Sequence, residues 1–122
     1  MDIHHHWIRD EEYIEATDDR VKRVIDSWRG QRPTMHYSYS RDEHLAPAKL
    51  GDKTHTEMHD IKMLLERGCK KQKLRAHSDL LPNAKVNDWA LSFGEHFDIQ
   101  TEAKGKNMAA EQLYRQHVQN SI

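Results

Sequence analysis

A run of basic side chains in the middle of the chain has the composition of a phosphate-binding segment. Residues 61–77 contain six Lys or Arg residues and one acidic residue, a net charge of +5 in a chain of 122 residues whose net charge is −1. Lysine and arginine neutralise the phosphates of nucleic acids, and each contact makes the affinity depend on salt. We expect four of these side chains to contact DNA phosphates: Lys70, Lys71, Lys73 and Arg75.

The next segment carries side chains that could read the edges of bases. Asparagine forms a pair of hydrogen bonds with adenine, and lysine reaches guanine or a phosphate. Asn83, Lys85 and Asn87 lie at the start of a predicted helix, where a helix in the major groove faces the bases. We expect these three residues to contact DNA. The alternative is that the basic run is a solvated surface and that the helix belongs to an ordinary core.

The spacing of apolar residues predicts three consecutive helices that would hold these side chains. The first covers residues 56–67 and ends at Gly68, and the second is a short helix at 70–77. The third covers residues 83–97, after Pro82. Its apolar face follows the helical period over five residues: Val86, Trp89, Ala90, Phe93 and Phe97.

Seven residues in 60–89 form a further pattern: Ile61, Leu64, Leu65 and Gly68 in the first element, and Pro82, Val86 and Trp89 in the second. With this pattern, residues 60–89 resemble the homeodomain-like helix-turn-helix of transposases, resolvases and, most closely, phage terminase small subunits. Leu80 departs from that pattern, because its position in the turn usually holds glycine. The resemblance implies a helix-turn-helix core that binds double-stranded DNA without catalysing a reaction, as a transcriptional regulator or an accessory factor of a phage or mobile element does.

The first half of the chain differs in charge and in pattern. Residues 1–60 have a net charge of −4, whereas residues 61–122 have a net charge of +3. A helix is predicted at 17–30, with Thr17 or Asp18 as its N-cap and Trp28 on its apolar face. Proline, glycine and a shortage of apolar residues predict a linker with at most one short strand at 31–54. The expected parts are an N-terminal helical arm (1–30), this linker (31–54), and a helix-turn-helix domain with a C-terminal helix (55–122).

The overall composition limits the classes of protein. Hydrophobic residues make up 36% of the chain and charged residues 32%, so the core is small and we expect a homo-oligomer. No apolar run is long enough to cross a membrane. The single Cys69 cannot form an intrachain disulfide, which favours a cytoplasmic location. The five glycines are too widely spaced for a phosphate-binding loop.

Ten histidines raise the question of a metal site. His55 and His59 have the i, i+4 spacing of two ligands on one helix face, but the residue after His55 is Thr56, so the H-E-x-x-H pattern is not met. We expect surface histidines and neither a metal nor another cofactor. A metal-dependent hydrolase that uses this pair is the least favoured alternative.

Together these patterns predict an all-α protein with a helix-turn-helix three-helix core, preceded by an N-terminal helix and an irregular linker and followed by a C-terminal helix. The expected function is non-enzymatic binding of double-stranded DNA. The alternative is a helical inhibitor or adaptor that binds a protein partner through its acidic N-terminal half.

Overall fold

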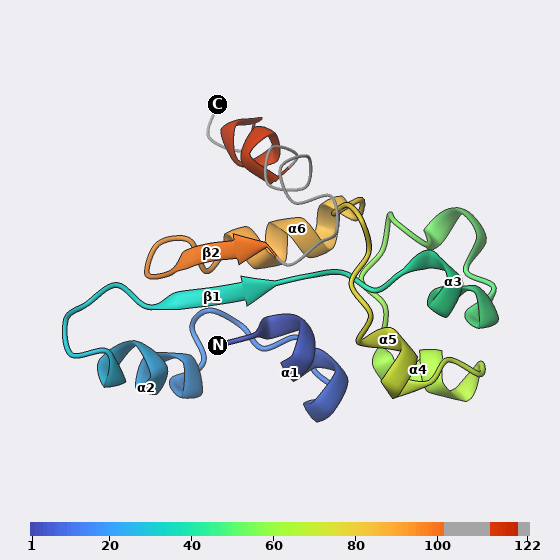
Figure 1. The fold of residues 1–122 in the computed structure, drawn as a ribbon, viewed down its shortest axis with the longest axis horizontal. Helices are drawn as coiled ribbons and strands as arrows, with labels where there is room; N and C mark the ends of the chain where they lie inside the picture. Colours follow the sequence, from blue (N-terminus) through green and yellow to red (C-terminus); the bar gives the residue numbers. More distant parts are fainter. Residues whose placement is uncertain (102–112, 120–122) are drawn as a thin grey trace.

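A short parallel sheet lies among the helices of the computed structural model, which describes residues 1–101 and 113–119 (Figure 1). Strand β1 (Thr34–Tyr37) pairs in parallel with β2 (Asp98–Thr101), so that Thr34 lies opposite Asp98 and Tyr37 lies opposite Thr101. The prediction of an all-α protein with a three-helix core is therefore wrong. Each strand has four residues, and its partner is far away along the chain, so local periodicity carries almost no signal for this pairing.

The other elements of the described chain are short helices. Residues 113–119 are helical as well. The α-helices are α1 (Ile3–Asp10), α2 (Asp19–Ser27), α3 (Asp42–Leu45), α4 (Ile61–Glu66), α5 (Lys71–Leu74) and α6 (Ala84–Leu91), and the 3-10 helices are η1 (Ala46–Ala48) and η2 (Gly51–Lys53).

Side-chain caps explain where the longer helices begin. Asp18 caps α2 by accepting a hydrogen bond from the Arg20 backbone N–H, as one of the two predicted caps would. Asp60 caps α4 in the same way. Gly68 follows α4 with a φ of +102°, a conformation that glycine adopts without strain, so it ends this helix as predicted.

The predicted helix-turn-helix has a different arrangement in the structure. α5 is a single turn, and nine residues, 75–83, separate it from α6, whereas a helix-turn-helix joins its two helices by about three or four residues. α6 ends at Leu91, so the predicted helix at 83–97 is too long at its C-terminal end. Residues 92–97 instead turn the chain back to begin β2. The resemblance of residues 60–89 to helix-turn-helix modules stays a matter of sequence pattern.

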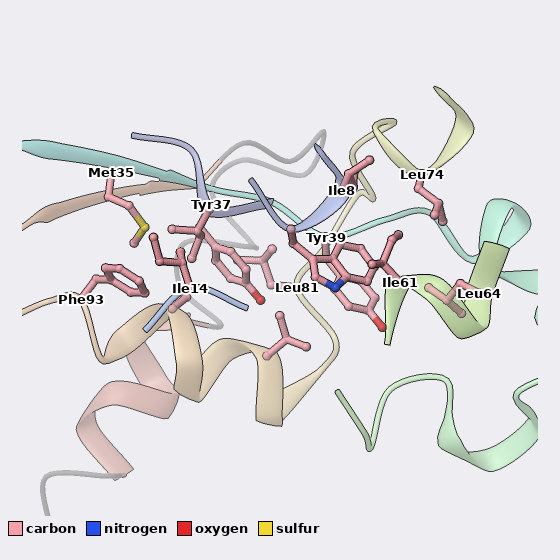
Figure 2. Packing of buried hydrophobic residues seen from close by; sticks show 14 of the residues in the cluster. Ile8, Ile14, Met35, Tyr37, Tyr39, Ile61, Leu64, Leu74, Leu81 and Phe93 are labelled. Carbon is pink, nitrogen blue, oxygen red and sulfur yellow. The ribbon is translucent and has the colours of Figure 1, made fainter. Parts of the chain in front are cut away.

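Residues 31–54, which we expected to form a linker, contribute to the core. They contain β1 and α3, and Met35, Tyr37 and Leu45 are buried. Figure 2 shows Met35 beside Phe93 at one end of the core. The alternation of inward residues in β1 follows from the pleat of a strand. The division of the chain into three parts stays a prediction.

The three tryptophans differ in burial. Trp28, predicted to be a core residue, follows the last residue of α2 and is 39% exposed. Trp7 is buried with α1. Trp89 is half-buried, and its indole N–H donates a 2.7 Å hydrogen bond to the Ile14 carbonyl.

The described helices are all too short or too polar to cross a membrane. The predicted C-terminal helix covers residues 107–118. Its first half, residues 107–112, lies outside the described residues, and residues 113–119 are helical.

Candidate nucleic-acid interface

The apolar residues around α5 fix the basic segment to the core. Leu74 and Cys69 are buried, and Figure 2 shows Leu74 near Leu64 of α4. The backbone N–H of Cys69 donates to the Leu64 carbonyl at 3.0 Å. Burial of Leu74 leaves the polar side of the single turn of α5 facing solvent.

Three of the four predicted phosphate contacts are exposed and form no ion pair within the described chain. Lys70, Lys73 and Arg75 are exposed, and none forms an ion pair with another residue of the described chain. These three cations lie within six residues, and no carboxylate of the described residues pairs with them.

The fourth of these cations, Lys71, already has a partner. Its ammonium group lies 3.1 Å from the carboxylate of Glu11, the residue at the C-terminal end of α1. Both side chains are about one third exposed, so this pair is less screened by solvent than a fully exposed one. The ion pair joins α1 to α5.

Asn83, predicted to read a base, is buried and has a structural role. Its side-chain oxygen accepts from the Val86 N–H and caps α6, and its amide group donates to the Glu57 carbonyl at 2.8 Å and to the Tyr39 hydroxyl at 3.2 Å. The side-chain amide of Asn83 is therefore hydrogen-bonded to groups inside the protein. As the structure stands, this side chain does not reach the surface.

Asn87 is also buried, and both the oxygen and the nitrogen of its side-chain amide form hydrogen bonds. Its oxygen accepts from the Tyr37 hydroxyl at 2.7 Å, and its nitrogen donates to the Leu81 carbonyl at 2.9 Å and the Gln116 side chain at 3.0 Å. The sequence contained a signal for this position, because Asn83, Asn87 and the buried Ala90 have the i, i+4, i+7 spacing of one helix face.

Lys85 is exposed on α6 and forms an ion pair with Glu57 at 3.0 Å. The hydrogen bond from Lys85 holds the pKa of Glu57 below its usual value. The seven predicted site residues therefore fall into three groups. Lys70, Lys73 and Arg75 are exposed and form no ion pair with the residues that the structure describes, Lys71 and Lys85 are paired with carboxylates, and Asn83 and Asn87 are buried.

The buried His4 helps to hold α5 in place, although the sequence predicted that it lies at the surface. The two ring nitrogens of His4 lie 2.9 Å from the Ser38 hydroxyl and 3.0 Å from the Ser40 hydroxyl. Ser40 donates its own proton to the Leu74 carbonyl at 2.7 Å, so its oxygen must accept from the Nε2–H of His4. Nδ1 then accepts from Ser38. The chain of hydrogen bonds ties α1 and the segment after β1 to the last residue of α5.

Burial also determines the charge of this histidine. Removal from water disfavours the imidazolium form and lowers the pKa of His4 to about 4. The nearby ring of His77, 6.1 Å away, acts in the same direction, whereas Asp2 opposes it. A neutral ring matches the one-donor, one-acceptor pattern of its bonds. No local signal could reveal this role, because both serines come from a distant segment.

The other histidines singled out from the sequence have separate partners. The ring nitrogen Nε2 of His55 lies 3.0 Å from the Asp42 carboxylate, whereas the ring of the buried His59 bonds to the Thr54 carbonyl at 3.1 Å. Within residues 1–101 and 113–119, no three His, Cys, Asp or Glu side chains are grouped so that they could hold a metal ion.

Comparison of the chain with protein-family models, curated proteins and solved structures found no match.

Proposed function

We propose that this chain binds DNA by contacting phosphates with the basic surface formed by Lys70, Lys73 and Arg75, which we call the α5 surface. The observation that carries the proposal is that these three exposed cations have no ion-pair partner in the described chain, although the structure has many carboxylates. Ammonium and guanidinium groups that are not paired with a carboxylate of the protein can bind phosphate oxygens.

The anchoring of the segment supports the same proposal. Leu74 is buried, and its carbonyl receives the hydrogen bond from Ser40. A surface held by the core loses less conformational freedom on binding than a flexible loop does. The α5 surface therefore presents its charges from a fixed backbone.

The environments of the two asparagines favour backbone contact over base reading. Asn83 and Asn87 would have to break internal hydrogen bonds to reach a base edge, and each buried partner left unbonded would cost about 1–3 kcal/mol. The proposed mode is thus electrostatic, with little dependence on DNA sequence. A cytoplasmic location, which the lone cysteine favours, belongs to the same proposal.

The alternative function, a protein interaction through the acidic N-terminal half, has less support. Many of its carboxylates already bind cations within that half: Asp10 pairs with Arg9, and Glu12 and Asp18 pair with Arg20. This internal pairing leaves less free negative charge than the sequence suggests. A homo-oligomer stays a prediction in either case.

Charge reversal on the α5 surface tests the proposal. A labelled random duplex of about 30 base pairs is titrated with wild-type protein and with the triple variant Lys70→Glu, Lys73→Glu and Arg75→Glu, and fluorescence anisotropy reports binding at low salt. We expect wild-type binding that the triple variant loses.

A second triple variant controls for net charge. Lys22→Glu, Arg23→Glu and Arg29→Glu make the same change in total charge on and beside α2, which lies at the opposite end of the molecule from α5 (Figure 1). This variant should bind nearly as well as wild type. Equal loss of binding in both variants would mean that only total charge matters, and would contradict an α5 surface.

A further inference from the structure

One of the four cations clustered around α5 is neutralised by a carboxylate from a distant part of the chain. Lys71 lies between Lys70 and Lys73 in sequence. Within residues 1–101 and 113–119 it is the one of the four that forms an ion pair, 3.1 Å from Glu11. A carboxylate on a lysine ammonium occupies the position that a phosphate oxygen would take.

The backbone of Glu11 is in an uncommon conformation. Its φ of 60° and ψ of 35° lie in the left-handed region, which residues other than glycine rarely adopt. This conformation ends α1, which also packs against α5. The fold therefore places the backbone of Glu11 next to α5.

Lys85 shows the same relationship a second time. This predicted DNA contact also has a carboxylate partner, Glu57, and both Glu11 and Glu57 belong to the acidic half of the chain, residues 1–60. The Lys85 pair is about half exposed and so is weaker than the Lys71 pair.

We propose that Glu11 is an intramolecular competitor of DNA phosphate for Lys71, and so limits the affinity of the α5 surface. This inference rests on the proposed function. DNA that recruits Lys71 must first displace the carboxylate, and the freed Glu11 then repels the nearby phosphate. Removal of the charge on Glu11 adds one phosphate contact and removes one repulsion.

Neutralisation of Glu11 tests the inference. Duplex binding is measured by anisotropy between 50 and 200 mM salt for wild type, Glu11→Gln and the control Asp98→Asn. Asp98 is the first residue of β2 and forms an ion pair with the exposed Arg32. The control Asp98→Asn therefore makes the same change in charge as Glu11→Gln, but away from α5. Glu11→Gln should bind about threefold or more tightly than Asp98→Asn at 50 mM salt, with a log–log salt slope steeper by about 0.9.

A double-mutant cycle assigns the effect to Lys71. In a Lys71→Met background, Glu11→Gln should change the affinity no more than Asp98→Asn does. Glu11→Gly is the second variant, because glycine fits the left-handed conformation and also removes the carboxylate. It should reproduce the gain seen with glutamine.

The outcomes separate this inference from the proposed function. If wild type binds duplex through the α5 surface but Glu11→Gln gains no more than Asp98→Asn, the competitor role is wrong and DNA binding stands. A gain that persists in the Lys71→Met background also overturns the role of this ion pair. If neither wild type nor Glu11→Gln binds, both proposals are wrong.

Discussion

The Tyr37 hydroxyl donates a 2.7 Å hydrogen bond to the side-chain oxygen of Asn87, and both residues are buried. This bond joins β1 to α6 inside the core. It makes Asn87 part of the structure that holds the strands and the helix together, and it accounts for a polar side chain on the inward face of α6.

Asn87→Ala should therefore destabilise the protein strongly. The substitution removes the acceptor of the buried Tyr37 hydroxyl and also the hydrogen bond that Asn87 donates to the Leu81 carbonyl. We expect a loss of about 2–4 kcal/mol in the free energy of unfolding, measured by urea denaturation. Lys85→Ala on the exposed side of the same helix should cost less than about 1 kcal/mol. Similar small losses in both variants would contradict the structural role of Asn87.

The same variant separates base reading from phosphate contact. At a temperature and urea concentration where Asn87→Ala is folded, we expect its affinity for duplex DNA to equal that of wild type, because Asn87 is buried. A drop in affinity with retained fold would restore the base contact predicted from the sequence.

Acid should weaken the fold through His4. The pKa of His4 is about 4 in the folded chain and about 6.5 when unfolded, so the unfolded state binds the proton first as the pH falls. Its contribution to stability is fully present above pH 6.5 and is lost as the pH falls towards 4, by at most about 3 kcal/mol. Urea denaturation of wild type and His4→Gln at pH 7 and pH 5 measures this, and wild type should lose more stability than the variant. An equal loss in both proteins would show that His4 is not held neutral.

Substitution of tryptophans should have unequal effects. Trp89 packs edge-on against Tyr13 and Phe93 and donates to the Ile14 carbonyl, so Trp89→Ala should cost about 3 kcal/mol or more. Trp28 is 39% exposed after α2, and Trp28→Ala should cost less than about 1 kcal/mol. Urea denaturation followed by circular dichroism measures both, and a larger cost at Trp28 would favour the core position first predicted for it.

Cys69 should react slowly with a thiol reagent in the native protein. It is 4% exposed, and burial raises the pKa of its thiol despite the lysines that follow it in sequence. We expect modification by a water-soluble aromatic disulfide to proceed rapidly only when urea unfolds the chain. Rapid labelling of the native state would mean that the segment between α4 and α5 opens readily.

Local sequence signals predicted the parts of the fold that depend on neighbours along the chain. The helices α2, α4 and α6 lie within predicted helices because apolar residues repeat at 3.6-residue spacing. Asp18 caps the start of α2 with its side chain, and Gly68 ends α4 because it adopts a positive φ without strain. The pairing of Thr34 with Asp98 depends on contacts across more than sixty residues. Four-residue strands offer too few positions for a period of two to be distinguished from chance.

The candidate site shows the same division. Exposure of Lys70, Lys73 and Arg75 follows from their charge and from the single apolar residue Leu74 that α5 buries. The burial of His4 could not be predicted, since its partners Ser38 and Ser40 are brought to it by the fold. The pairing of Lys71 with Glu11 likewise depends on how α1 ends beside α5.

The salt dependence of duplex binding tests the central claim most directly. For wild type, a plot of the logarithm of the association constant against the logarithm of salt concentration should have a slope of about −2.7, from about 0.9 for each of three phosphate contacts. Charge reversal at Lys70, Lys73 and Arg75 should abolish binding. A slope near zero in wild type, or a slope unchanged by charge reversal, would contradict DNA binding through the α5 surface.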